Sequence, residues 1–337
     1  TLRKYFRDHN FECMVMCYGF GYQLNSELLL NISSISNSDG FSFIPDASLL
    51  GNIFIHGISN LLTTAVYQPT LKISLKDGLT FKDRSKDLNI KLDSLKYGKE
   101  KNVLFGVDTR GVADPNMDHL NKCIEVTLTV HGRDIKVNES KQPTEEIYNE
   151  QLFRVATINT INQCIQKLKY NEGSYIKILN DLIKEMERNC KGSQYIENIL
   201  FDLNGQVKEA LNMTQKGKQE NWFEKWGIHY LRSLQDAYKN EICNNFKDKG
   251  VSNFSSGLFN RVREEVSNIF DELPPPKSDI KYPPPQKSHP TGPRTVRSQA
   301  PPTMEIYNSA SGGCCAEGSR ILMGDNTYKK VEELKKG

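Results

Sequence analysis

The spacing of hydrophobic and polar residues changes twice along the chain, and each change marks a different kind of structure. In residues 1–64, the continuously apolar stretches CMVMCYGFG and FSFIP are separated by helical patterns. Such alternation is typical of parallel strands that helices cover on both faces. Asp46 is the expected N-cap of a following helix, whose apolar residues recur every three or four positions. The spacing predicts an α/β unit over 1–64.

Between residues 65 and 142 the hydrophobic period becomes two. The stretches LKISLK, LNIKLDSL and IEVTLTV alternate apolar with polar side chains, and turn sequences stand at 76–78 and 131–134. Alternation of this kind indicates antiparallel strands with one face toward solvent. The segment is therefore predicted to be a small, all-β sandwich.

Residues 143–273 carry the period of amphipathic helices. Thr144 is the expected N-cap of the first helix, and Gly192 suits the end of the second. Five apolar stripes are predicted to face a helical bundle core, and they run through 158–168, 176–186, 196–211, 222–237 and 258–269. Trp222 and Trp226 lie one turn apart and are interpreted as core residues, with an anchor for a protein partner as the alternative.

The composition changes again after residue 273. Ten of the fourteen prolines lie between 274 and 302, which favours extended backbone and predicts a Pro-rich linker over 274–313. A docking segment for a proline-binding domain is the alternative. Residues 314–337 then show two short apolar runs around a Gly-Asp-Asn turn, the pattern of a β-hairpin. The predicted fold class is multidomain, with α/β, all-β and all-α parts.

Composition and charge exclude several classes of function. The net charge of +3 is small, and no basic stripe with interleaved aromatics indicates nucleic-acid binding. No apolar run approaches the ~18 residues of a membrane span, so no membrane contact is expected. The chain opens at Thr1 inside a helix-like segment without a leader, which suggests a fragment of a longer protein.

The eight cysteines do not form a zinc-binding pattern. They are scattered, and none belongs to a CxxC repeat followed by paired histidines. Cys13 and Cys17 are expected to share one face of a strand as buried apolar residues, with a metal role as the alternative. This cysteine usage favours a reducing, cytoplasmic or intracellular compartment.

The stretches YGFGYQLNSELLLNIS and GFSFIPDASLLGNIFIHGISNLL resemble the C-terminal part of a von Willebrand factor type A (VWA) domain, which has a Rossmann-like sheet. The resemblance covers about the last third of that fold and implies binding of a protein partner. The family's metal site uses an Asp-x-Ser-x-Ser loop, which is absent here. The resemblance therefore implies no cofactor and no metal ligand in this chain, and Mg²⁺ or Mn²⁺ only at the VWA site of the intact protein.

The stretches KWGIHYLRSLQDAYKNEICNNFKDKGV and SSGLFNRVREEVSNIFDELPPP resemble the Vwaint module. This module stands between a VWA domain and a Hint-type domain in some eukaryotic proteins. The resemblance assigns 65–142 to a β-sandwich part and 143–273 to a helical part. It implies no activity, and a link to ubiquitin-ligase modules rests on family analogy alone.

The stretch SGGCCAEGSRILMGDNTYKKVEELKKG resembles the first block of a Hint (Vint) domain, the fold of inteins and hedgehog autoprocessing domains. Placing Ile321 at the eighth position of that block makes Cys314 the first residue and nucleophile, with Cys315 as the alternative. The chemistry needs a thiol at this place and an unhindered carbonyl before it, which Gly313 supplies.

The expected function is therefore the protein-interaction portion of an autoprocessing protein, cleaved or spliced at the bond between Gly313 and Cys314 through a thioester. The family's helper residues lie beyond Gly337, so this stretch is expected to be inert by itself, and its status as an enzyme stays open. The alternative function is a non-catalytic, protein-binding scaffold with a degenerate Hint remnant.

Overall fold

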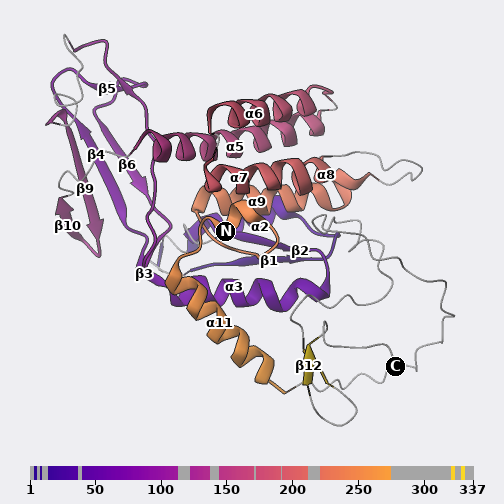
Figure 1. Ribbon diagram of the computed structural model, residues 1–337. Coiled ribbons are helices and arrows are strands. Elements are labelled where there is room, and N and C mark those ends of the chain that lie inside the picture. The colour runs from indigo at the N-terminus through magenta and orange to yellow at the C-terminus, as the bar shows by residue number, and fades with distance from the viewer. Residues whose placement is uncertain are drawn as a thin grey trace.

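The computed structural model describes residues 4–5, 8–9, 14–36, 40–112, 122–136, 144–170, 172–190, 192–211, 221–274, 320–322 and 328–330. Helices and small sheets are mixed in this part of the chain. A parallel strand pair lies between layers of helices, and an antiparallel sheet stands at one end (Figure 1).

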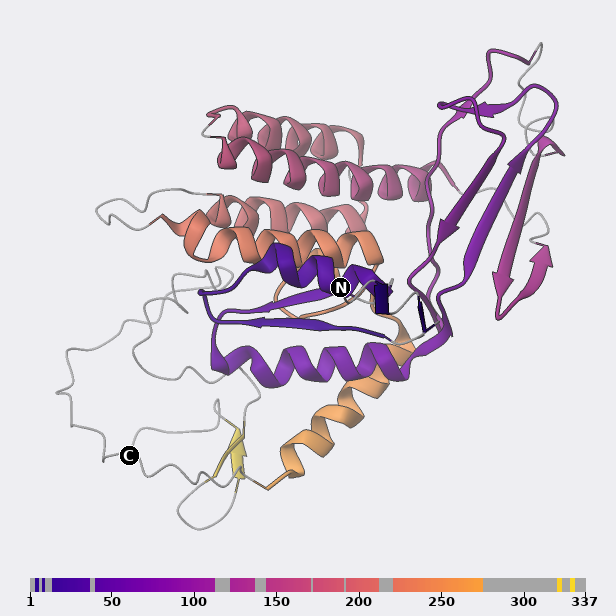
Figure 2. The same cartoon turned by 180° about the vertical axis from the view of Figure 1, so that it is seen from behind.

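The N-terminal segment forms the predicted parallel strands. Strand β1 (Cys17–Phe20) pairs with β2 (Phe41–Ile44), and α2 (Ser26–Ser33) connects them. The helices α2 and α9 (Ile228–Asn240) lie on one side of the pair, and α3 (Leu50–Leu62) lies on the other (Figures 1 and 2). The predicted start after Asp46 is confirmed. Its carboxylate accepts a hydrogen bond from Ser48 N at 2.6 Å and opens the 3₁₀ turn η2 (Ala47–Leu49), which leads into α3.

The second segment forms the predicted antiparallel sheet. Its strand order is β10-β9-β4-β6, and the bounds are β4 (Thr70–Leu75), β6 (Asp87–Lys91), β9 (Ile124–Val130) and β10 (Arg133–Lys136). The predicted turns contain left-handed residues, with φ of +51° at Asp77 and +47° at His131. Shorter antiparallel pairs join β3 (Thr64–Tyr67) to β7 (Ser94–Lys96) and β5 (Thr80–Phe81) to β8 (Val107–Asp108).

The third segment is helical, as predicted. Its further helices are α5 (Glu145–Lys169), α6 (Tyr175–Asn189), α7 (Gln194–Asp202), α8 (Lys208–Ala210), α10 (Lys249–Ser252) and α11 (Gly257–Glu272). Thr144 caps α5 by accepting a hydrogen bond from Ile147 N at 3.2 Å. Two π-helical segments, η3 (Leu203–Val207) and η4 (Phe223–Gly227), precede α8 and α9.

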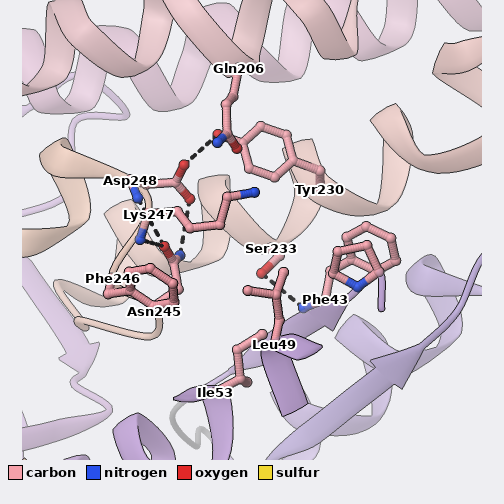
Figure 3. Close-up of a pocket in the computed structure, with 11 residues that line it drawn as sticks. Phe43, Leu49, Ile53, Gln206, Tyr230, Ser233, Asn245, Phe246, Lys247 and Asp248 are labelled. Atoms are coloured by element: carbon pink, nitrogen blue, oxygen red, sulfur yellow. Dashed lines mark hydrogen bonds between the residues drawn. The ribbon is translucent and has the colours of Figure 1, made fainter. Parts of the chain in front are cut away.

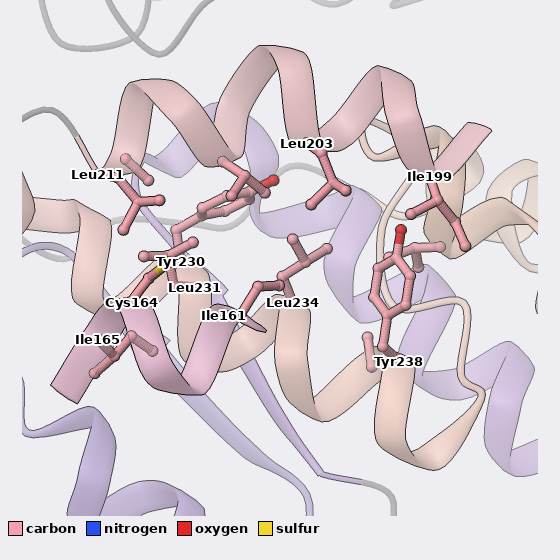
Figure 4. Close-up of a cluster of buried hydrophobic side chains, with 14 of the residues drawn as sticks. Ile161, Cys164, Ile165, Ile199, Leu203, Leu211, Tyr230, Leu231, Leu234 and Tyr238 are labelled. Atoms are coloured by element: carbon pink, nitrogen blue, oxygen red, sulfur yellow. The ribbon is translucent and has the colours of Figure 1, made fainter. Parts of the chain in front are cut away.

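One hydrophobic core joins the first and third segments. Cys17, Phe41 and Phe43 from the strands belong to the same buried cluster as Ile161 of α5 and Leu234 of α9. Figure 4 shows the helical part of this cluster, where side chains from α5, α7 and α9 meet. The core therefore extends across residues 64 and 142, at which the hydrophobic pattern changes. A separate, smaller core lies under the antiparallel sheet around Ile73, Leu75, Leu79, Phe81 and Cys123.

Helix α11 departs from the sequence pattern. Its apolar stripe over 258–269 was expected to face the core, but Phe259 is its one fully buried residue and Ile269 is 61% exposed. The helix crosses α3, where Phe270 packs so closely that a Cβ atom on Gly51 would lie 3.1 Å from its ring. In the second half of the stripe, Val262 and Val266 are half-buried and Ile269 is exposed, so its prediction as core is wrong.

The strands of the predicted C-terminal hairpin are present. β11 (Arg320–Leu322) and β12 (Tyr328–Lys330) pair in antiparallel register, with Ile321 opposite Lys329. Among the helices that the structure describes, none has the length and apolar character needed to cross a bilayer.

Candidate functional site

The three residues that the sequence assigns to the cleavage site lie outside the described residues. These are Gly313, Cys314 and the alternative nucleophile Cys315. Cys13 also lies outside them, whereas Cys17 is buried at the start of β1, as expected for an apolar role. The candidate site that the structure does show is centred on α9, whose polar residues contact all three segments of the chain.

The predicted core stripe through α9 is confirmed. Trp226 is fully buried and Trp222 nearly so, and their rings pack edge to face with centroids 6.0 Å apart. Both tryptophans therefore serve packing inside the chain. A close backbone contact accompanies them, because a Cβ atom on Gly227 would lie 2.2 Å from the carbonyl oxygen of Ala210.

One face of α9 takes the place of a neighbouring strand beside β2. Phe41 N donates to Asp236 Oδ2 at 2.8 Å, and Phe43 N donates to Ser233 Oγ at 3.1 Å. The Ser233 hydroxyl in turn donates to Phe41 O at 3.2 Å. These bonds satisfy backbone groups on the edge of β2 that faces away from β1. Gly40 is required here, because its φ is +92° and a Cβ atom would lie 2.0 Å from Asp236 Oδ2.

The N-terminal half of α9 binds the start of α2. His229 Nδ1 lies 2.9 Å from Ser26 Oγ, and Arg232 donates to the same oxygen at 3.0 Å. Burial lowers the pKa of His229, which favours the neutral ring. Arg232 also pairs with Glu27, and hydrogen bonds from Lys169 and Arg232 lower the pKa of that carboxyl.

The C-terminal end of α9 holds the segment between β7 and β8 and contacts α5. Glu241 caps the helix in a left-handed conformation, with φ of +53°. Its carboxylate accepts bonds from the backbone and side-chain amides of Asn102, both at 3.0 Å, and lies 3.8 Å from Lys101 Nζ and Arg154 Nε. Arg154 also donates to Tyr238 O at 2.8 Å. Almost all of this cluster is buried, so removing one member would leave its partners unpaired.

A third face of α9 contacts the buried carboxyl of Asp202. Asp202 Oδ2 accepts bonds from Gly250 N at 2.8 Å and from Tyr238 Oη at 3.1 Å. Burial raises the pKa of Asp202 well above its ordinary value, and the nearby charge of Asp248 raises it further. No side chain fits at Gly250, because a Cβ atom there would lie 1.8 Å from Tyr238 Oη.

A second buried carboxyl, Asp248, lies in the loop after α9. It accepts a bond from Tyr230 Oη at 2.8 Å and one from Asn245 Nδ2 at 3.0 Å. Asn245 Oδ1 accepts bonds from the backbone N–H groups of Lys247 and Asp248, which fixes the loop. Burial raises the pKa of Asp248 and lowers that of Lys247.

This loop borders a small cavity of ≈ 40 Å³ between α9, α3 and η3 (Figure 3). The cavity is lined by Phe43, Pro45, Leu49, Ile53, Gln206, Tyr230, Ser233, Asn245, Phe246, Lys247 and Asp248. It combines an apolar floor from β2 and α3 with a polar wall from η3 and the loop. Nothing in the sequence pattern indicated it, because its floor at 43–53 lies more than 150 residues before its walls at 206–248.

The part of the chain that the structure describes contains no candidate metal centre. No group of three or more histidine, cysteine, aspartate or glutamate side chains in it is arranged to hold a metal ion. The cysteines at 17, 123, 164, 190 and 243 are free thiols.

One family model matches the part of the chain that contains this site. A family model described as "Vwaint: VWA / Hh protein intein-like" matches residues 193–268, which run from the start of α7 into α11. No curated protein and no solved structure matches the chain. The matched range contains Ser233, Asp236, Glu241, Asp202 and Asp248. The comparison supports a Vwaint-type, intein-associated module in the helical part of the chain.

Proposed function

We propose that the described residues between 14 and 274 form the carrier of an autoprocessing protein, in which the Vwaint-type module fastens a VWA-type α/β segment to the body. The observation that carries this proposal is the pair of bonds from β2 to Asp236 and Ser233, because it joins the matched module to the N-terminal strands. These bonds fix two segments that lie about 190 residues apart in sequence against each other, so that they form one unit.

The N-terminal segment has features of one end of a larger parallel sheet. On the side of β1 away from β2, the backbone N–H groups of Tyr18 and Phe20 make no hydrogen bond within the described residues, and Phe20 is 59% exposed. Phe54, Ile58 and Leu61 of α3 are also exposed. A two-stranded parallel sheet is an unusual final state, since parallel strands are normally buried on both faces and in larger sheets. Further VWA strands, with any Mg²⁺ or Mn²⁺ site, would belong on this side.

The processing step is assigned to the junction that follows the linker. The thiolate of Cys314 attacks the carbonyl carbon of Gly313, and the bond from that carbon to the Cys314 nitrogen breaks. The nitrogen takes a proton and becomes a free amine, so the peptide bond is exchanged for a thioester within the same chain. Water, a thiol or another nucleophile then releases the acyl group of Gly313. The β11–β12 pair just after this junction supports a folded start of the Hint domain.

Mass spectrometry of the intact protein tests this proposal. Release of a product ending at Gly313 is expected, and dithiothreitol should speed it because a thiol attacks thioesters. Cys314→Ala should abolish release, whereas Cys315→Ala should leave most of it. The reverse pattern would move the cleaved bond to Cys314–Cys315.

A non-catalytic scaffold is the second candidate. The exposed apolar residues of α3 and α11 favour it, because contiguous apolar surface of this kind marks protein contacts. Absence of any thiol-dependent product from the intact protein would leave the scaffold as the function.

A further inference from the structure

The second half of α11 combines exposed apolar residues with negative charge. Ile269 is 61% exposed, and Leu273, just after the helix, is 58% exposed. Glu265 and Glu272 stand four residues before and three residues after Ile269, which makes them its neighbours on the helix surface. Residues 264–273 contain four carboxylates and no basic residue. This range, called the acidic half of α11 below, therefore borders apolar surface with negative charge.

The acidic half of α11 is held in place by the body of the protein. Phe259 near the start of the helix is buried in the main core. Near the other end, Phe270 packs on α3, where a Cβ atom on Gly51 would lie 3.1 Å from its ring. Because these contacts already order the helix, a partner that binds it has little conformational entropy to overcome.

The strand pair β11–β12 has the complementary pattern. Arg320 stands directly opposite Lys330, and Leu322 stands directly opposite Tyr328. Directly opposite positions share a face of an antiparallel pair, and so do positions two residues apart along a strand. One face of this pair therefore combines two basic positions with two apolar positions.

The strand pair by itself lacks both an anion and a surface to pack on. Like charges at directly opposite positions destabilise an antiparallel pair, and the six strand residues include no acidic residue that could offset Arg320 and Lys330. Among the described residues the pair forms a sheet of two strands, and such a sheet is marginally stable in water. Carboxylates beside exposed apolar side chains would supply what is missing.

The length of chain between the two surfaces favours a contact within one molecule. Only 46 residues separate Leu273 from Arg320 in the sequence. A linker of that length keeps its two ends at an effective concentration on the order of 1 mM, so even a weak contact within the chain forms ahead of one with a more dilute partner. Charge and chain length therefore indicate the same occupant.

We propose that the acidic half of α11 is the docking surface for the strand pair β11–β12 of the same chain, with its carboxylates beside the basic positions and its apolar residues beside the apolar positions. Cys314 lies six residues before β11, so the contact would hold the processing junction beside the carrier. That consequence rests on the proposed function, whereas the contact itself requires no cleavage.

Zero-length cross-linking of the full chain with a carbodiimide tests the proposal. The reagent joins a carboxylate to an amine only where the two are in contact, and the variant Cys314→Ala keeps the junction intact. Lys330 should link to Glu265 or Glu272 about ten-fold more often than Lys329, which stands on the other face of the strand pair. Equal links from the two lysines, or no links, would overturn the proposal.

Exchanging the charges gives a set of matched variants. Glu272→Lys should reduce the link between Lys330 and Glu265 about five-fold, because it places a like charge beside the basic positions. Adding Arg320→Glu should restore the link, since the two charges have then been exchanged. The control Glu187→Lys on the exposed surface of α6 should leave the link unchanged. An equal fall in the control, or a double variant that links as weakly as Glu272→Lys, would contradict the proposal.

Mixing isotope-labelled and unlabelled chains before cross-linking shows which molecule supplies the strand pair. Links within one chain support the proposal, whereas links between labelled and unlabelled chains would make a second copy the occupant and overturn it. Processing is measured separately in the natural protein. Links without a thiol-dependent product would keep the contact and reject the processing step, and a product without links would do the reverse.

Discussion

The two outer edges of the β1–β2 sheet differ in what covers them. Beside β2, side chains of α9 bind the backbone N–H groups of Phe41 and Phe43 that point away from β1. Beside β1, the corresponding groups of Tyr18 and Phe20 have no partner within the described residues. A helix can thus close a sheet edge when it places a carboxylate and a hydroxyl one turn apart. The β2 side of the α/β segment is thus closed by a helix inside the range that the Vwaint family model matches, and the β1 side is not closed by any described residue.

The largest expected effect compares two phenylalanines on these strands. Phe41 is 1% exposed in the shared core, whereas Phe20 is 59% exposed at the β1 edge. Phe41→Ala should lower the free energy of unfolding by about 3–5 kcal/mol, because it leaves a cavity among packed helices. Phe20→Ala should change it by no more than about 0.5 kcal/mol. Urea denaturation of both variants measures the difference, and equal losses would show that the β1 edge is packed as well.

The second effect concerns the stability of the protein at low pH, which depends on a histidine in α3. His56 is buried in α3, its ring centroid lies 5.9 Å from that of Phe259 in α11, and burial lowers its pKa to about 4, with the charge of Arg263 acting in the same direction. Below pH 6.5 the His56 ring is protonated in the unfolded chain, whereas in the folded chain it stays neutral down to about pH 4. This contribution to stability is therefore complete above pH 6.5 and is lost as the pH falls to 4, a total of about 3 kcal/mol.

The variant His56→Asn isolates this contribution from other titrating groups. The difference in unfolding free energy between the natural protein and the variant should shrink or reverse from pH 7 to pH 4 and stay constant below it. A difference that does not depend on pH would mean that the ring is accessible to protons in the folded state.

The third effect tests the side-chain closure of the β2 edge. Asp236→Ala removes the acceptor of Phe41 N and should lower the free energy of unfolding by about 1–3 kcal/mol. The matched control is Asp181→Ala, which breaks an exposed ion pair with Lys177 on α6 and should leave the free energy of unfolding almost unchanged. Thermal denaturation of the two variants makes the comparison, and similar losses would show that the β2 edge does not depend on Asp236.

The smallest effect concerns an exposed carboxylate of α2 that pairs with α9 and α5. Glu27 is mostly exposed and pairs with Arg232 of α9 and Lys169 of α5. Glu27→Gln should cost about 0.5 kcal/mol at low salt and almost nothing in 1 M salt, because ions screen exposed charges. Denaturation at both salt concentrations measures this, and a loss that salt does not reduce would indicate a role beyond the ion pairs.

The sequence predicted the features that depend on residues close to each other along the chain. The parallel strands, the cap at Asp46, the cap at Thr144 and the hairpin turns follow from local hydrophobic period and backbone preference. The stripe through α9 was predicted as core, and Ser233 on that stripe was a usable signal, since a hydroxyl on a buried face needs a partner. Its partner could not be identified, because Phe43 lies 190 residues earlier.

Other features depended on which surfaces the fold leaves uncovered. The stripe of α11 has the period of a core helix, yet Ile269 is exposed although Phe270 beside it packs on Gly51 of α3. The polar wall that Gln206 contributes to the cavity depends on the π-helical segment η3, which has no sequence signature comparable to a cap or a turn. The assignment of Cys314 and Gly313 to the cleavage site stays a prediction, since both lie outside the described residues.

Amide hydrogen exchange at single residues tests the central claim most directly. If α9 closes the β2 edge, the amides of Phe41 and Phe43 should exchange at least 100-fold more slowly than those of Tyr18 and Phe20 in the same strand pair. In Asp236→Ala, protection should fall at Phe41 and remain at the amides between β1 and β2. Equal exchange rates at Phe41, Phe43, Tyr18 and Phe20 in the natural protein would contradict the account.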